Sequence, residues 1–151
     1  MRLNRKYVLL EFLVILAFSL MVGYCSFAAE NPPLPELDKP IFLTSCGQSP
    51  DYGIPNLLGK RIGLEMELAP LAEPEEIVGF KTLIIVIGGS GKGLGAAGVD
   101  VPEEVQRIEN IIEKAREEGI YILGMHLGGE ARRGPTSENF IPFAAEVDYL
   151  I

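Results

Sequence analysis

Residues 82–87 read Thr-Leu-Ile-Ile-Val-Ile, an unbroken run in which most side chains are β-branched, and six glycines lie among the eleven residues that follow it. Strands whose two faces are both buried have this composition, and they occur in parallel sheets. Shorter apolar segments that we expect to be further strands lie at residues 41–44, 65–68, 121–125 and 147–151. The chain is therefore expected to fold around a parallel sheet.

Helical segments alternate with these strands. Asp100 and Glu103 have the spacing of a capping box, Pro102 suits a first helical turn, and Gly119 marks the end of the helix. An apolar stripe at helical spacing follows the cap, formed by Val105, Ile108, Ile111, Ile112 and Ala115. The acidic residues of this helix are expected to form a solvated face. A shorter helix is expected at residues 56–62, with Gly53 and Pro55 weakening any earlier start.

This alternation predicts an α/β fold, an open and mostly parallel sheet with flanking helices, like flavodoxin or a Rossmann domain. The last predicted strand, at residues 147–151, has no helix after it to cover it. We therefore expect a domain that is truncated at its C-terminal end, or one whose sheet edge another chain covers.

Residues 1–28 are predicted to be a signal peptide, which implies export. Arg2, Arg5 and Lys6 precede an apolar run at residues 7–22, and small residues continue to Ala28, after which signal peptidase is expected to cut. The alternative is that the apolar run is retained as a membrane anchor, because it has about the minimum length to span a bilayer.

The rest of the chain divides into a Pro-rich tether at residues 29–39 and a single α/β domain at residues 40–151.

The full chain has 21 acidic and 13 basic residues, for a net charge of −8. Removal of residues 1–28 takes away one acidic and three basic residues, which leaves 20 and 10 and a charge of −10. This acidity argues against binding to nucleic acid. Cys46 would then be the only thiol, so an intrachain disulfide is excluded in the processed form.

Three compositionally unusual loops follow predicted strands, at residues 44–51, 88–98 and 126–134. Carboxyl ends of parallel strands lie at one edge of the sheet, where α/β proteins bind their ligands. The residues we expect to contact a ligand there are Ser45, Gln48, Gly89, Ser90, Lys92, Gly93, Glu130, Arg132 and Arg133.

The central loop is suited to an anion, because glycine lets backbone N–H groups converge and Lys92 adds a positive charge. It is not a Walker A loop, since Val86 and Gly93 stand where that motif needs Gly and Ser or Thr. Residues 93–98 do match the Gly-x-Gly-x-x-Gly pattern of dinucleotide-binding loops. They are poorly placed for that role, because the predicted strand ends before Gly88 and the predicted helix starts only at Asp100. A glycine loop with a purely conformational role is the alternative. No cofactor is expected.

The other two loops leave two interpretations open for each of their polar residues. Arg132 and Arg133 suit a carboxylate or phosphate ligand, or they pair with Glu130 or Glu138. His126, the only histidine, is either a hydrogen-bonded structural residue or a general base. Cys46 is either a packed, inert thiol or a nucleophile that His126 activates. No metal site is expected, because a single histidine offers too few ligands.

Three motifs together resemble an uncharacterised family of exported bacterial proteins, known only as a domain of unknown function. The motifs are Leu-Thr-Ser-Cys-Gly-Gln-Ser at residues 43–49, the glycine-rich stretch at residues 88–98, and Gly-Gly-Glu-Ala-Arg-Arg-Gly at residues 128–134. The resemblance covers nearly all of the chain after the leader. It implies export and an α/β domain, and it implies no reaction. Similar members continue beyond residue 151, and Gly53 and Pro55 depart from the continuous helix expected there.

The function expected from the sequence is that of an exported domain that holds a small anionic or polar metabolite, with a membrane transporter as a candidate partner. One alternative is a hydrolase or transferase that uses Cys46 or a serine with His126. A second alternative is an assembly module that pairs through its sheet edge. The sequence does not decide whether the protein is an enzyme.

Overall fold

Five parallel strands form the sheet in the part of the chain that the computed structural model describes, residues 34–151. Their order across the sheet is β2-β1-β3-β4-β5, with every neighbouring pair parallel. The strands are β1 (Ile41–Cys46), β2 (Glu67–Leu68), β3 (Thr82–Ile87), β4 (Tyr121–Met125) and β5 (Tyr149–Leu150). The predicted fold class, a parallel α/β sheet with flanking helices, is confirmed. The predicted leader and the first residues of the predicted tether lie outside the described residues.

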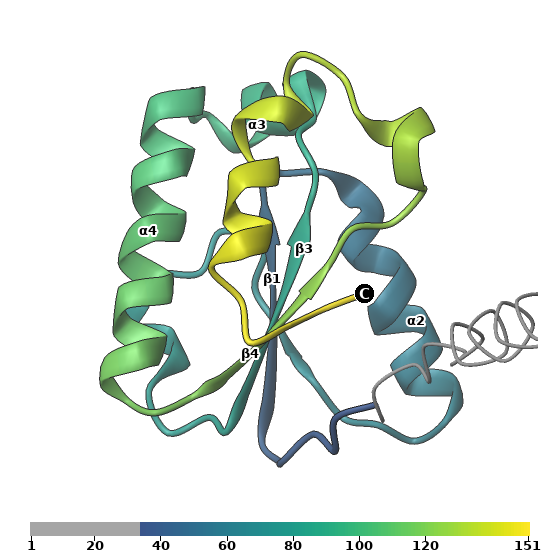
Figure 1. Cartoon of the computed structure of the whole chain (residues 1–151), viewed down its shortest axis with the longest axis vertical. Helices are drawn as coiled ribbons and strands as arrows, with labels where there is room; N and C mark the ends of the chain where they lie inside the picture. Colours follow the sequence, from purple (N-terminus) through teal and green to yellow (C-terminus); the bar gives the residue numbers. More distant parts are fainter. Residues whose placement is uncertain (1–33) are drawn as a thin grey trace, which may run out of the picture. The chain divides into compact units, whose positions relative to one another are not determined.

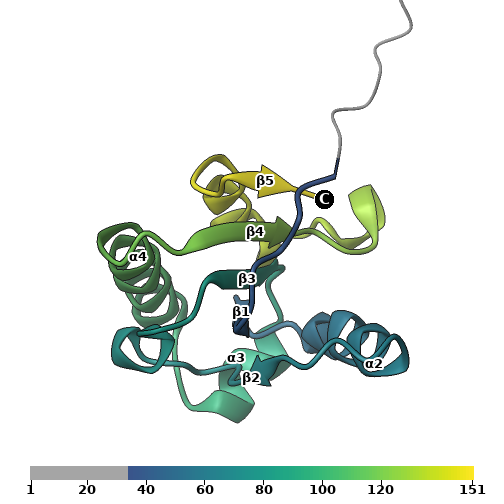
Figure 2. The same ribbon diagram turned by 90° about the horizontal axis from the view of Figure 1, so that it is seen from below.

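Helices cover both faces of this sheet. The longest, α4, lies on one face and α2 lies on the other (Figures 1 and 2). The α-helices are α2 (Gly53–Arg61), α3 (Gly91–Ala97) and α4 (Val101–Glu117). Five 3-10 turns join the elements: η1 (Pro50–Tyr52), η2 (Pro74–Ile77), η3 (Gly129–Arg132), η4 (Ser137–Asn139) and η5 (Ile141–Ala145). None of the helices in the described residues is long and apolar enough to cross a membrane.

Burial of β3 on both of its faces explains why residues 83–87 are all apolar. All six of its residues are buried. Leu83, Ile85 and Ile87 join the core on one side of the sheet, while Ile84 and Val86 join a second core on the other side. Alternating side chains of one strand thus fill two separate cores, so both alternating sets must be apolar.

The capping box of α4 is present as predicted. Asp100 accepts a hydrogen bond from the Glu103 backbone N–H, and Glu103 accepts one from the Asp100 backbone N–H, both at 2.9 Å. Ile108, Ile111 and Ile112 of the predicted stripe are buried against the sheet. The expectation of a wholly solvated acidic face is wrong at one position, because Glu104 has no exposed surface.

The segment at residues 88–98, expected to be a loop, contains the helix α3. Ser90 caps its first turn by accepting a hydrogen bond from the Gly93 N–H at 3.0 Å. Gly98 ends it with a φ of 74°, the left-handed conformation that glycine adopts without strain. Sequence reasoning missed this helix because glycine has low helix propensity. The cap and the C-terminal glycine were nevertheless both visible in the sequence.

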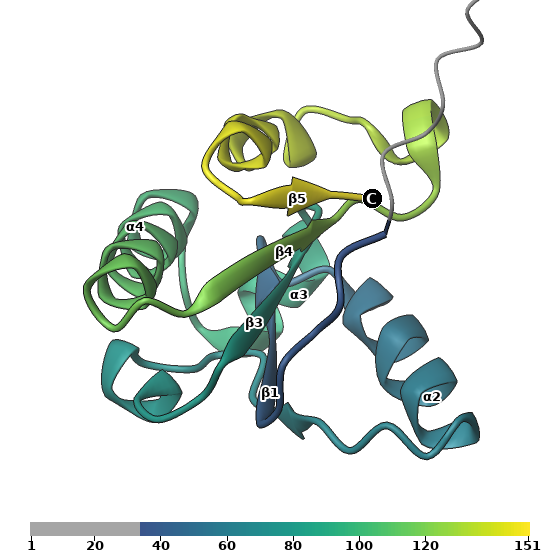
Figure 3. The same cartoon turned by 60° about the horizontal axis from the view of Figure 1, so that its bottom comes forward.

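Several boundaries differ from the predicted ones by a few residues. Strand β1 continues through Cys46, because its polar residues Thr44 and Ser45 are buried and hydrogen-bonded to backbone carbonyls. Helix α2 begins at Gly53, so Pro55 falls in its first turn, where it removes no helical hydrogen bond. Both edge strands, β2 and β5, are two residues long. Figure 3 shows β5 lying along β4 at one edge of the sheet.

Candidate functional site

The strand order places a topological switch point between β1 and β3. The chain leaves β1 toward β2 on one side, and it leaves β3 toward β4 on the other. The loops after β1 and β3 are joined there by backbone hydrogen bonds: Ser90 N–H donates to Gly47 O at 2.9 Å, and Ser49 N–H donates to Gly88 O at 3.2 Å. Gln48 and Gly89 also form an isolated antiparallel bridge. Two of the three predicted loops therefore form one rigid unit where ligands of open α/β sheets bind.

Gln48 holds this unit in place from inside. Its backbone has a φ of 56°, which is uncommon for a residue other than glycine, and its side chain is buried. The amide Nε2 donates to the Pro70 carbonyl and to Glu104 Oε1, both at 3.0 Å. The side-chain amide of Gln48 is therefore already hydrogen-bonded within the protein, although Gln48 also lines a pocket described below.

A buried ion pair on α4 supports the same loop. Arg107 Nε donates to Glu104 Oε2 at 2.8 Å, and Arg107 Nη2 donates to Glu104 Oε1 at 2.8 Å. Arg107 also donates to the carbonyls of Ser45 and Ala72. Glu104 in turn accepts from the Gly47 N–H at 2.9 Å. Sequence reasoning missed this pair, but a signal was present: Glu104 lies four residues before Ile108 and seven before Ile111, on the buried stripe.

Gly93 is needed where α3 passes the first loop. A Cβ at this position would overlap the carbonyl oxygen of Gln48. At Gly95, on the same helix, a Cβ would meet nothing within 4 Å. The glycine at residue 93 thus permits the close approach of α3 to the first loop, whereas the one at residue 95 has no such role.

Two pockets open at this edge, and Ser90 lines both. The larger, of about 530 Å³, contains Lys92 and is lined by Gln48, Pro50, Tyr52, Pro70, Leu71, Ser90, Lys92, Gly93, Ala96 and Ala97. The smaller, of about 250 Å³, contains the arginine pair and is lined by Gly89, Ser90, Ala131, Arg132, Arg133, Gly134, Pro135, Thr136 and Ser137. Seven of the nine predicted ligand residues line one pocket or the other. The two that do not are Ser45, which is buried, and Glu130, which is exposed.

Arg132 links the third loop to the first. Its Nη2 donates to both carboxylate oxygens of Asp51, at 2.8 and 2.7 Å, and Ser49 Oγ donates to Asp51 Oδ2 at 2.6 Å. Partial burial raises the pKa of the Asp51 carboxyl, but the hydrogen bonds from Arg132 and Ser49 outweigh this and hold that pKa below its usual value. The expected partners for Arg132, Glu130 or Glu138, are thus wrong for this residue. Arg133 does pair with Glu138, with Nε at 3.0 Å from Oε1.

Ser137 fastens the third loop to the central one. Its hydroxyl oxygen accepts from the Gly89 N–H at 3.1 Å and lies 3.0 Å from the Arg132 carbonyl, to which it can donate. Together with the Arg132–Asp51 pair, this contact brings all three predicted loops together. Ser137 was not singled out by sequence reasoning, because it lies outside the third predicted loop, which ends at residue 134.

His126 contacts backbone rather than a nucleophile. Its Nδ1 lies 2.9 Å from the Ile87 carbonyl oxygen, and its Nε2 lies 3.2 Å from the Gly129 carbonyl oxygen. A neutral imidazole can donate to only one of these acceptors. Within the described residues the ring has no hydrogen bond to a serine or cysteine. This arrangement favours the structural interpretation of His126.

Cys46 is packed in the core at the end of β1. Its side chain has no exposed surface, and burial, with a further contribution from Glu104, strongly raises the pKa of its thiol. A buried neutral thiol is a poor nucleophile, because the thiolate is the reactive form. Among the described residues no group of three or more His, Cys, Asp or Glu side chains could hold a metal ion.

Comparison with known sequences adds one firm result. Residues 38–151 match the family described as a domain of unknown function, DUF6305. The chain belongs to the DUF6305 family. No curated protein matches it.

Two solved structures are similar to the DUF6305 chain. One is a putative GMP synthase subunit from Thermoplasma acidophilum, 14% identical with a TM-score of 0.40, where the match covers 72% of this chain and 46% of that one. The other is the psychrotrophic esterase EstA from Pseudoalteromonas sp., 12% identical with a TM-score of 0.41, where the match covers 76% of each chain. The matched part is thus less than half the length of the first of these proteins.

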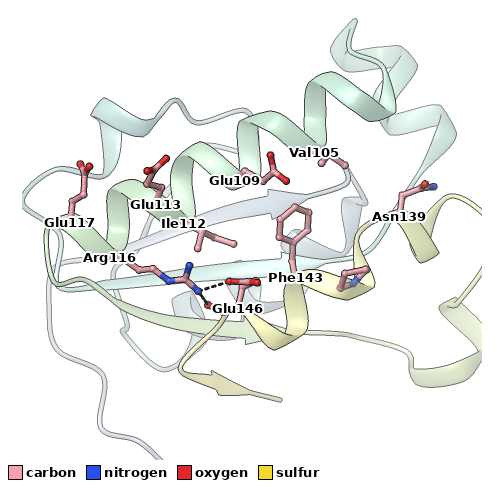
Figure 4. Close-up of a pocket in the computed structure, with 10 residues that line it drawn as sticks. Val105, Glu109, Ile112, Glu113, Arg116, Glu117, Asn139, Phe143 and Glu146 are labelled. Carbon is pink, nitrogen blue, oxygen red and sulfur yellow. Dashed lines mark hydrogen bonds and ion pairs between the residues drawn. The ribbon is translucent and has the colours of Figure 1, made fainter.

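The DUF6305 domain has a further cavity of about 590 Å³, between α4 and η5 (Figure 4). Val105, Ile112 and Phe143 contribute apolar surface, while Glu109, Glu113, Glu117 and Glu146 make its rim acidic. Arg116 is paired with Glu146 across it. None of the residues predicted to bind a ligand lines this groove, and its charge is opposite to that of the two pockets at the carboxyl edge.

Proposed function

We propose that the DUF6305 domain binds a small anionic or polar metabolite at the carboxyl edge of its sheet, without chemical conversion. One observation carries this proposal. The chain has 21 acidic residues, yet among the described residues no acidic side chain lines either pocket at that edge. Lys92 lines the larger pocket without an ion-pair partner there, whereas Arg132 and Arg133 in the smaller pocket are paired with Asp51 and Glu138. An anion entering the larger pocket would therefore meet the unpaired Lys92 and no carboxylate among the described residues that line it.

Hydrogen-bond donors at the pockets suit the same ligand class. The Ser90 oxygen accepts from the Gly93 N–H, so its own hydrogen remains available for a ligand in either pocket. Lys92 is exposed and has no ion-pair partner among the described residues. The larger pocket lies in the volume range of small-molecule sites, roughly 300 to 1,000 Å³. A metabolite with a carboxylate or phosphate next to Lys92 would satisfy these groups.

The two alternatives have less support. A cysteine-based enzyme needs an accessible thiolate, and Cys46 is buried with a raised pKa. Pairing through the sheet edge is favoured by a long edge strand, and the edge strand β2 is two residues long, a length that natural proteins use to prevent pairing.

A dye-based thermal shift against carboxylates, phosphates, sugars and amino acids tests the proposal; the chain has no Trp, so an extrinsic dye is needed. A ligand at a hundred times its Kd adds about 2.7 kcal/mol to the stability of the folded state. Calorimetric titration of the active compound should then show that Lys92→Ala weakens binding about tenfold, consistent with loss of one charged hydrogen bond.

Lys81→Ala is the matched control, because Lys81 is exposed at the opposite end of β3 and lines neither pocket. The proposal fails if no compound class raises the melting temperature. It also fails if the Lys92 and Lys81 variants bind the active compound equally well.

The proposal extends to an exported protein, from which a membrane transporter would collect the ligand. Support for export comes from the basic, apolar and small-residue order of residues 1–28. Mass spectrometry of the protein recovered from the cell exterior or periplasm should find an N-terminus at Ala29. An intact N-terminus in the membrane fraction would instead indicate a retained anchor.

A further inference from the structure

The outward face of α2 is apolar. Ile54, Leu57 and Leu58 are 49%, 54% and 53% exposed, and Ile62, just after the last helical residue, is 79% exposed. Their spacing of three, four and eight residues from Ile54 places them on one side of the helix. Single exposed aliphatic residues are common, but a continuous row of four along one helix marks an interaction surface.

The inward face of α2 explains how this row comes to be exposed. Only Pro55 and Gly59 are buried within the helix. A Cβ at Gly59 would overlap the Met66 side chain, so the helix approaches the rest of the domain through its smallest residues. Its large side chains therefore point away from the core, opposite to the usual arrangement of an amphipathic surface helix.

The charge around this row is positive. Arg61 lies seven residues after Ile54 and four after Leu57, within the apolar face, and Lys60 flanks it. No acidic residue occurs between Asp51 and Glu65, in a chain whose net charge is −8. Neither Lys60 nor Arg61 forms an ion pair among the described residues.

We propose that the outward face of α2 docks on an anionic lipid bilayer. Ile54, Leu57 and Leu58 would enter the boundary between headgroups and acyl chains, and Arg61 and Lys60 would contact lipid phosphates. A helix with aliphatic residues on one face and basic residues beside them has the composition that lies in the plane of a membrane surface. Anionic lipids attract such basic groups and repel the rest of this acidic chain, so the domain would settle with α2 toward the bilayer.

A second copy of the chain fits this face less well. A symmetric contact would place the same patch against itself, which would bring Lys60 and Arg61 of both copies into one interface with no acidic residue of α2 to pair them. A stable dimer also buries about 800 Å² on each partner, more than one face of a nine-residue helix offers.

The sequence before the domain supports a nearby bilayer. The apolar run at residues 7–22 is the segment that would remain as an anchor if the leader is not cut. The expected tether at residues 29–39 is short, so an anchored chain would keep its domain beside the membrane surface. Docking by α2 does not depend on the anchor, since the face is part of the domain itself.

An environment-sensitive fluorophore on α2 tests the proposal in the full chain. A Cys25→Ser background leaves only the buried Cys46, and Leu58→Cys then provides one exposed labelling site. Val78→Cys is the matched control, since Val78 is 49% exposed and lies outside α2. Each labelled protein is mixed with vesicles of phosphatidylcholine containing phosphatidylglycerol, and with vesicles of phosphatidylcholine alone.

The fluorescence emission of the label at position 58 should shift to shorter wavelength and become more intense with the anionic vesicles only. The emission of the label at position 78 should not change. Lys60→Gln and Arg61→Gln should each weaken the vesicle affinity measured by the position-58 response about fivefold, because each removes one positive charge, and Lys81→Gln should leave it unchanged. Equal responses at positions 58 and 78, or no response at position 58, would overturn the proposal. A response at position 58 that appears without vesicles and grows with protein concentration would assign this face to a second copy instead.

Discussion

The carboxylate of Glu104 accepts a hydrogen bond from the backbone N–H of Gly47 at 2.9 Å, although the two residues lie 57 positions apart in the chain. The same carboxylate receives donors from Gln48 and Arg107. Through this one side chain, α4 holds the loop that follows β1 and, with it, one wall of the pocket that contains Lys92. The stability of the domain and the shape of its proposed ligand site therefore depend on the same buried charge.

Glu104→Gln is expected to reduce the free energy of unfolding by about 3 to 5 kcal/mol, because it leaves the buried Arg107 guanidinium without a counter-charge. Urea denaturation measures the change. Glu109→Gln on the exposed side of the same helix is the control and should stay within about 0.5 kcal/mol of the parent protein. A loss below about 1 kcal/mol for Glu104→Gln would show that the pair is not structurally important.

Gly93→Ala and Gly95→Ala should have opposite effects on stability. Alanine at residue 95 meets open space and improves helix propensity, which should stabilise the domain by about 0.5 to 1 kcal/mol. Alanine at residue 93 would overlap the Gln48 carbonyl, and because backbone cannot move aside easily we expect a loss of about 3 kcal/mol. Thermal unfolding of the two variants compares them directly. Equal effects would mean that α3 does not approach the first loop closely.

The sheet and α4 were predictable because their signals are local. The run at residues 82–87 had to supply two cores at once, and the Asp100–Glu103 box with the Ile108 stripe specifies a helix without any tertiary contact. The loops of the candidate site were also predictable as a group, since strand polarity alone brings them to one edge.

The contacts within the site were not predictable in the same way. Helix α3 was missed because its glycines oppose a helix locally, and the need for Gly93 arises only from its approach to Gln48. The choice of Asp51 as the partner of Arg132 depends on a separation of 81 residues, which no local pattern reveals. Glu104 could have been found, since its position on the apolar stripe was visible in the sequence.

Cys46 should be inert in the folded protein. In a Cys25→Ser chain, a thiol reagent such as Ellman's reagent should modify nothing in native buffer and one thiol per chain in urea, because the Cys46 side chain has no exposed surface and burial raises its pKa. Lys81→Cys, which places a second thiol at an exposed position, is the positive control and should react in native buffer. Rapid modification of Cys46 under native conditions would restore it as a candidate nucleophile.

The Asp51–Arg132 pair should make the stability of the domain sensitive to acid. The folded-state pKa of Asp51 lies below its ordinary value of 3.8, because the hydrogen bonds from Arg132 and Ser49 outweigh the effect of partial burial. A carboxyl whose pKa falls on folding contributes stability that is fully present above the ordinary value and is lost as pH falls through the folded value. The difference in unfolding free energy between the parent and Asp51→Asn should therefore be constant at neutral pH and should shrink below about pH 4.

Arg132→Gln is the control for this dependence, because it removes the donor and leaves the carboxyl in place. In that background the Asp51→Asn substitution should alter the loss of unfolding free energy below about pH 4 much less, since the main group that lowers the Asp51 pKa is gone. If Asp51→Asn alters this low-pH loss equally in both backgrounds, Arg132 is not what holds the Asp51 carboxylate charged. Arg132 would then be free to serve a ligand in the smaller pocket, and the third loop would be held by the contact of Ser137 with Gly89 of the central loop.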